Sequence, residues 1–278
     1  MNARVLLVEC ADRPGLVHAI TGVLFQHGVN VVGNQEFVER GSARFFMRTE
    51  FEGTVAADRL EADLRQALPA EAHVQLSALK PKRIVVLASK EHHCLGEILV
   101  RHAFGELHAQ VLAVLSNHAT LEPFVRRFDL PFHHLPHENL TREAHEAELL
   151  KIIEPLQPDY LVLAKYMRVL TPAFVHRFPA HIVNIHHSFL PAFAGARPYQ
   201  QAFDRGVKVI GATAHYVTEN LDEGPIVVQQ VIPVDHTHTA ADLARAGRDV
   251  EQMVLARALR LVFEDRVFLC GNRTVIFE

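Results

Sequence analysis

Apolar positions in the first eighty residues follow strand and helix periods in turn. A short apolar run around Leu7 ends at the turn sequence 12–15, and apolar residues then recur every three or four positions from Leu16 to His27. Gly28 follows where a helix commonly ends. This pattern predicts a strand followed by an amphipathic helix.

The next segments predict a hairpin, a second helix and a last strand. Residues 29–38 and 44–51 flank a polar turn, and apolar residues alternate along 44–51. Thr54 is the expected N-cap of a helix whose leucines share one face, and a short alternating strand follows near 74–76. The order βαββαβ predicts a ferredoxin-like domain over residues 1–80.

A different pattern begins after residue 83 and predicts a second domain over residues 84–278. Five short apolar runs without alternation are typical of strands that are buried on both faces. They are 84–88, 111–115, 132–135, 160–163 and 182–185. Helices lie between and after them, with Thr141 as one expected N-cap and Thr239 with Asp242 in capping-box spacing. We expect a doubly wound, mainly parallel, Rossmann-like α/β sheet that binds its ligands at the carboxyl ends of the strands.

The composition narrows the classes of partner. The formal net charge is −4 and the isoelectric point is about 6.5, so the chain has no basic excess that would favour nucleic acid or an anionic membrane. Its apolar runs are short and no leader pattern opens the chain, which favours a cytoplasmic protein. The three cysteines, Cys10, Cys94 and Cys270, are far apart and odd in number, and we expect reduced thiols.

The 19 histidines raise the question of a metal site. The densest group, His133, His134 and His137 with Glu138, is interrupted by Pro136 and matches no zinc-binding spacing. We therefore expect neither a metal nor another cofactor.

Polar side chains appear where the fifth buried strand ends. Because side chains alternate along a strand, Asn184 and His186 should point to one side and His187 to the other. An amide and an imidazolium that share one oxygen suit the tetrahedral intermediate of acyl transfer. On these residues alone, however, a loop-tethering asparagine and a structural histidine remain the better interpretation.

A second polar segment supplies a carboxylate. Residues 211–217 and 226–231 are expected strands, and Asp222 lies on the loop between them. An aspartate on a loop is usually only a turn residue. If the loop instead brings Asp222 to His186, the carboxylate would favour the imidazolium and could accept a proton from an attacking water.

These segments resemble the signature of folate-dependent formyltransferases. The resemblance includes Phe189, Leu190, Pro191, Gly195 and Pro198 beside the two polar segments, and it runs nearly end to end. Residues 12–16, D-R-P-G-L, place an ACT-like domain before the formyl transferase domain. Within the family the chain is most similar to the members that hydrolyse 10-formyltetrahydrofolate, which supply formate for purine synthesis and balance the one-carbon pools.

The resemblance assigns roles to residues in the second domain. It implies that Asn184 and His186 bind the formyl oxygen and that Asp222 relays protons and activates water. The segment expected to hold the pterin ring, largely through its backbone, is Tyr166, Met167, Arg168, Val169 and Leu170. The loop to Asp222, including Asn220, closes the opposite side. His215 either orients the site or is a buried structural histidine.

Water is the expected acceptor of the formyl group. Residues 89–96 contain one glycine and acidic Glu91, a poor cradle for the phosphate of an amine acceptor. Lys90 and His93 are expected to border the water side, with Cys94 nearby as a structural thiol. His187 stands where transformylases usually carry proline, which agrees with the hydrolase pattern. The alternatives are a transferase to a small amine and a noncatalytic folate or amino-acid sensor.

The ACT-like domain suggests regulation. The turn at Asp12 and Gly15, with Leu16 beginning the helix, could receive the carboxylate of an amino acid. By resemblance, we expect a small effector such as glycine or methionine and self-association into a homo-oligomer. The alternative is that this domain only holds subunits together.

Overall fold

The computed structural model describes residues 4–192 and 198–278 and divides into two compact units. The first comprises Met1–Lys80, Glu264–Cys270 and Val275–Glu278, and the second comprises Pro81–Phe263 and Gly271–Thr274. The C-terminal segments thus group with the first unit, whereas the expected second domain ran to residue 278. Gly195 of the expected signature lies outside the described residues.

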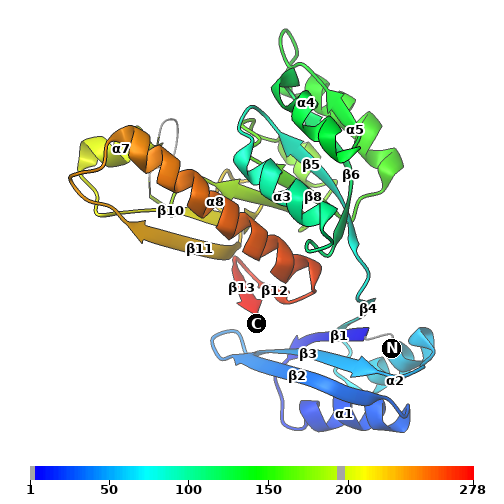
Figure 1. Ribbon diagram of the computed structural model, residues 1–278. Coiled ribbons are helices and arrows are strands. Elements are labelled where there is room, and N and C mark those ends of the chain that lie inside the picture. Colours follow the sequence, from blue (N-terminus) through cyan, green and yellow to red (C-terminus); the bar gives the residue numbers. More distant parts are fainter. Residues whose placement is uncertain (1–3, 193–197) are drawn as a thin grey trace. The chain divides into compact units, whose positions relative to one another are not determined.

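The first unit has the predicted βαββαβ order (Figure 1). Its elements are β1 (Arg4–Ala11), α1 (Leu16–Gln26), β2 (Asn30–Glu39), β3 (Arg44–Glu52), α2 (Ala57–Ala67) and β4 (His73–Ala78). The strands pair in the order β2-β3-β1-β4, and all three pairings are antiparallel. Apolar residues of β1 and β3 pack against Ile20, Leu60 and Leu64 from the two helices, which cover one face of this sheet.

Of the two helix ends expected in this unit, the structure has the one at Gly28 and lacks the N-cap at Thr54. Gly28, with a φ of 66°, follows α1 as its expected cap. Thr54 is not the N-cap of α2, because Ala56 holds that position and makes no side-chain capping bond. Burial of Leu60 and Leu64 in the core, rather than a cap, stabilises this helix.

The other face of the sheet is covered by the end of the chain, which the sequence pattern did not predict. Phe268 and Phe277 pack on Val5, Leu7 and Phe46 in a small apolar cluster. Strands β12 (Val267–Cys270) and β13 (Arg273–Ile276) form this terminal hairpin.

The second unit contains a seven-stranded sheet. Its strands are β5 (Lys82–Ala88), β6 (Ala109–Ser116), β7 (Phe132–His134), β8 (Tyr160–Ala164), β9 (Ile182–His186), β10 (Val209–Tyr216) and β11 (Ile226–Pro233). Their order is β11-β10-β9-β8-β5-β6-β7. Strands β5 to β9 pair in parallel, while β10 is antiparallel to both neighbours. The predicted mainly parallel, doubly wound architecture is confirmed.

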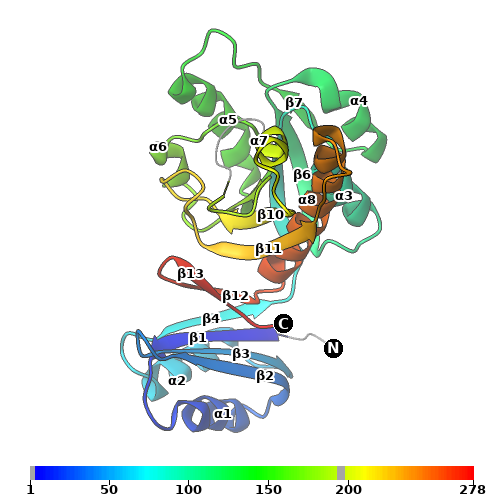
Figure 2. The same cartoon turned by 90° about the vertical axis from the view of Figure 1, so that its left-hand side faces the viewer.

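Helices cover both faces of this sheet (Figure 2). They are α3 (His93–Ala103), α4 (Glu122–Val125), α5 (Arg142–Leu156), α6 (Pro172–Val175), α7 (Pro198–Arg205) and α8 (Ala240–Phe263), with 3-10 turns at Ala119–Leu121 and Arg126–Phe128. Helices α3 and α8 lie together on one face and α5 lies on the other.

The predicted helix starts of this unit are confirmed. Thr141 Oγ1 accepts a bond from the Ala144 amide at 3.2 Å, and Thr239 and Asp242 form a reciprocal capping box. Among the helices of residues 4–192 and 198–278, none is long and apolar enough to cross a membrane.

Candidate active site

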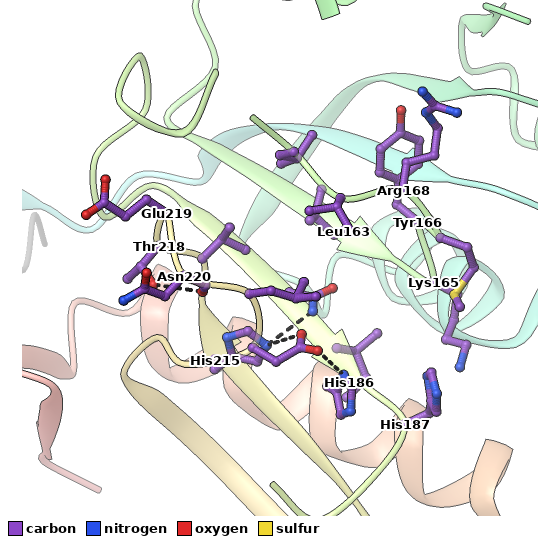
Figure 3. A pocket seen from close by; sticks show the side chains of 18 residues that line it. Leu163, Lys165, Tyr166, Arg168, His186, His187, His215, Thr218, Glu219 and Asn220 are labelled. Carbon is purple, nitrogen blue, oxygen red and sulfur yellow. Dashed lines mark hydrogen bonds and ion pairs between the residues drawn. The ribbon is translucent and has the colours of Figure 1, made fainter. Parts of the chain in front are cut away.

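A pocket of about 240 Å³ opens in the second unit between three segments of the chain. One segment follows β8, the second is the end of β9 and the third runs from β10 into the loop before β11 (Figure 3). Asn184, His186 and Asp222 all line this pocket. The fold therefore brings together the three residues that the sequence singled out.

Asn184 and His215 face each other across β9 and β10. They are register partners, and Asn184 Nδ2 lies 3.2 Å from His215 Nε2. The other ring nitrogen, Nδ1, donates to the Tyr216 carbonyl oxygen at 2.8 Å, so a neutral ring leaves Nε2 as the acceptor for the Asn184 amide. Burial lowers the pKa of His215 from its ordinary value, which favours this neutral form. His215 thus fixes the direction of the amide.

Asp222 joins His215 to His186. Its Oδ2 lies 3.3 Å from Nδ1 of His186, and its Oδ1 lies 3.7 Å from Nε2 of His215. Burial acts to raise the pKa of Asp222, but the hydrogen bond and charge of His186, with smaller contributions from His215 and His187, lower the net value. The carboxylate is therefore ionised at neutral pH and faces the His186 ring.

The backbone around the β10–β11 loop orients the side chains of His215 and Asp222. A register shift between Ala214 and His215 interrupts the β10–β11 ladder, and such bulges re-aim side chains. Asp222 has a φ of 57°, a left-handed conformation that aspartate tolerates better than most residues. A Cβ on Gly224 would lie 1.8 Å from the Tyr216 carbonyl oxygen, so only glycine allows this close return of the chain.

The segment expected to hold a pterin lines the opposite wall. All five residues, Tyr166 to Leu170, border the pocket. Tyr166 and Leu170 pack into the apolar core, whereas Met167 is 61% exposed. The Met167 amide donates to Ser89 Oγ at 3.1 Å, which ties the segment to the end of β5. Two of the five side chains are thus turned into the core, whereas those of Met167 and Val169 are exposed.

His187 does not follow the predicted alternation. Strand β9 ends at His186, and the two imidazole rings stack with centroids 4.8 Å apart and an interplanar angle of 16°. Both residues line the same pocket. The expectation that His187 points to the other side is wrong, because the alternation stops where the extended backbone stops.

The structure places Lys90 and His93 outside the lining of this pocket, since neither is among the described residues that border it. Lys90 is exposed, and His93 is buried on α3 with its Nε2 2.7 Å from Glu251 Oε2. Lys165 does line the pocket, although no local sequence pattern singles it out.

The described residues contain one group with a ligand spacing suited to a metal ion, namely His93, Cys94 and Glu251, whose donor atoms lie within 4.8 Å of one another. Burial, with the charge of Glu251, raises the pKa of the Cys94 thiol well above its ordinary value. Lys165 and His93 already engage Glu251. A protonated thiol and an occupied carboxylate do not fit a metal well.

The residues of the expected effector site lie at the start of α1. Asp12 and Gly15 are exposed, and Gly15 has a φ of 88°. Leu16 is 3% exposed and packs into the core of the first unit. Leu16 therefore anchors the helix, and Asp12 and Gly15 remain accessible.

Comparison with known proteins identifies both units. The formyl transferase family model matches residues 82–259, and the ACT domain model matches residues 4–69. The formyltetrahydrofolate deformylase of Escherichia coli (strain K12) is 55% identical over 99% of each chain. A solved formyltetrahydrofolate deformylase from Pseudomonas syringae pv. tomato matches with a TM-score of 0.96 and 38% identity, covering 100% of this chain and 95% of the other.

A solved glycinamide ribonucleotide transformylase from Symbiobacterium toebii is also similar, with a TM-score of 0.69 and 33% identity over 74% of this chain and 98% of its own. Its coverage leaves part of the present chain unmatched, whereas the deformylases match both units. The chain therefore belongs to the formyl transferase family, in the branch that joins an ACT domain to a formyl transferase domain and is formed by the formyltetrahydrofolate deformylases.

Proposed function

We propose that this chain hydrolyses 10-formyltetrahydrofolate to formate and tetrahydrofolate. The observation that carries the proposal is the contact chain in one pocket from Asn184 through His215 and Asp222 to His186. It places an amide, an imidazole and an ionised carboxylate around a single opening, which is the equipment that acyl transfer requires.

Each group has a distinct role in the proposed reaction. The Asn184 amide and the protonated His186 ring donate to the formyl oxygen as it gains negative charge. Asp222, whose Oδ2 faces His186 Nδ1, takes up a proton from the attacking water as the oxygen bonds to the formyl carbon. The bond between the formyl carbon and N10 then breaks, and Asp222 returns the proton to N10. Loss of one such oxyanion donor typically costs about 2.7 to 4 kcal/mol of barrier.

Hydrolysis is favoured over transfer to an amine by the extent of the similarity. The full-length relatives carry the name deformylase, and the transformylase match covers a smaller part of this chain. The direct test incubates the purified protein with 10-formyltetrahydrofolate and no acceptor. Equal amounts of formate and tetrahydrofolate are expected. Turnover that requires an added amine would indicate a transferase, and folate binding without turnover would indicate a sensor.

We also propose that the ACT domain binds a small amino acid and associates with a second copy. The accessible left-handed Gly15 and Asp12 at the start of α1 support a carboxylate-binding turn, since helix N-termini attract anions. The test titrates glycine and methionine into the formate assay while native mass is recorded. A change in rate with either amino acid in the wild type, lost in Gly15→Val, is expected.

A further inference from the structure

A buried ionic cluster lies beside the pocket and is not used by the reaction scheme above. At its centre, Glu251 of α8 is fully buried. Its Oε2 lies 2.7 Å from His93 Nε2 and 3.1 Å from Lys165 Nζ, and its Oε1 accepts a bond from the Tyr199 hydroxyl at 2.5 Å. We call these four residues, His93, Lys165, Tyr199 and Glu251, the Glu251 cluster.

Glu251 is an anion at neutral pH. Burial acts to raise its pKa, but the bonds from His93 and Tyr199 and the charge of Lys165 lower it to about 2. A buried ion pair is rarely the most stabilising solution, because both charges must lose their hydration. We therefore expect the buried ion pair of Lys165 and Glu251 to have a role in the pocket beyond stabilising the fold.

The fold makes room for this cluster. Gly247 lies one helical turn before Glu251, and a Cβ there would lie 2.1 Å from the Tyr199 hydroxyl oxygen. The absence of that side chain lets Tyr199 cross α8 to reach Glu251. The arrangement is thus built into the helix, and Glu251 is held from three directions.

Lys165 connects the cluster to the pocket. It follows β8 with a φ of 59°, a left-handed conformation that costs about 1 kcal/mol or more for a residue with a long side chain. Its side chain is 9% exposed and borders the pocket together with His186 and His187. In Figure 3 the Lys165 side chain runs toward His187. The ammonium has three N–H bonds, and the contact with Glu251 uses one of them.

We propose that Lys165 binds the carboxylate of the product formate, and that Glu251 is the positioning residue that holds the ammonium at the pocket wall. The inference rests on the proposed hydrolysis. The formyl group is a neutral amide in the substrate, whereas attack by water converts it into an anion and leaves one proton behind. Transfer to an amine would yield another neutral amide, so a buried cation at this wall suits hydrolysis specifically.

The test measures formate binding and formate release separately. Sodium formate is titrated as a product inhibitor, and ¹³C-formate binding is followed by NMR line broadening in the absence of folate. The variants are Lys165→Met, Lys165→Arg and the double variant Lys165→Met/Glu251→Gln, which removes both charges and so avoids an unpaired buried carboxylate. Lys151→Met is the matched control, because Lys151 pairs with Glu148 on the exposed surface of α5.

For Lys165→Met and for the double variant we expect formate affinity to fall about tenfold or more, with KM for the folate changed less than about threefold. Lys165→Arg should retain more affinity than Lys165→Met, and Lys151→Met should match the wild type. Formate affinity within about twofold of the wild type in both charge-removing variants would overturn the inference. Failure of the proposed function would instead appear as a wild-type protein that releases no formate, whatever its affinity for ¹³C-formate.

Discussion

Asp222 Oδ2 lies 3.3 Å from Nδ1 of His186, although one residue belongs to the loop after β10 and the other ends β9. The contact places an ionised carboxylate beside an imidazole ring inside a pocket. His215 contacts the same Asp222 carboxylate and also orients the Asn184 amide.

Replacing Asp222 by Asn should abolish most of the turnover while folate still binds. The substitution keeps the shape of the side chain but removes the carboxylate that is proposed to take the proton from water, so we expect kcat to fall by about 10² to 10⁴ with little change in folate affinity. The control is Glu223→Gln, which changes an exposed neighbour of the same loop. Steady-state kinetics and folate titration of both variants provide the check. Near-normal kcat in Asp222→Asn would exclude a chemical role for the carboxylate.

His215 should make the protein less stable as the pH falls below neutrality. Its folded-state pKa is lowered by burial below the ordinary value of 6.5, so the unfolded chain binds a proton at a pH where the folded chain does not. Stability therefore falls as the pH drops through about 6.5 toward the lowered folded pKa. Asp222 has the same sign, but its lowered pKa places that loss at pH values below its ordinary 3.8.

Urea unfolding at about pH 7.5 and pH 5.5 isolates the His215 contribution by comparing the wild type with His215→Gln. The other histidines titrate in both proteins, so the difference between the two pH slopes belongs to this residue. We expect a steeper loss in the wild type. Identical slopes would mean that His215 is protonated as easily in the folded protein as in the unfolded chain.

Gly224→Ala should damage the site through the backbone. The added methyl group would meet the Tyr216 carbonyl, which accepts the bond from His215 Nδ1, so the loop must move away from His186. We expect a loss of about 1 to 3 kcal/mol in stability and at least about a tenfold loss in kcat. Gly22→Ala is the control. A Cβ there meets nothing within 4 Å inside α1, and it should stabilise the protein by up to about 1 kcal/mol. Equal kcat for the wild type and Gly224→Ala would show that this close approach does not position the loop.

Arg48→Met should loosen the C-terminal segment of the first unit. The buried guanidinium donates to the carbonyls of Glu264 and Asp265 at 3.0 and 2.9 Å and pairs with Glu50 at 2.6 Å. Leaving these acceptors unpaired should cost about 2 to 4 kcal/mol. Arg65→Met, which removes an exposed pair with Glu61, should cost less than about 1 kcal/mol. Urea midpoints and limited proteolysis measure both, and equal midpoints would contradict the role of Arg48.

The periodic elements were predictable because their apolar spacing is local information. Strands β5, β6, β8 and β9 coincide with apolar runs, and the caps at Thr141 and Thr239 need only neighbouring residues. Thr54 has the right residue type in the right place but makes no capping bond. A capping pattern is therefore a weaker signal than the apolar face it precedes.

What the sequence could not supply is contact between distant segments. Phe46 shares its face of β3 with Arg44 and Arg48, and no local pattern identifies Phe268 and Phe277 as the residues that cover it. The pairing of Lys165 with Glu251 likewise depends on how α8 lies across the sheet. Asn184, His186 and Asp222 were candidates from their chemistry and from a family resemblance, and only the folded chain shows that they share a pocket.

The most direct test of the central claim follows the oxygen that attacks the formyl carbon. The protein is incubated with 10-formyltetrahydrofolate in ¹⁸O-water without any amine, and the formate is analysed by mass spectrometry alongside tetrahydrofolate. We expect formate carrying one oxygen from the solvent, released in equal amount with tetrahydrofolate. Undiminished formyl folate, or turnover that appears only when an amine is added, would contradict hydrolysis at this site.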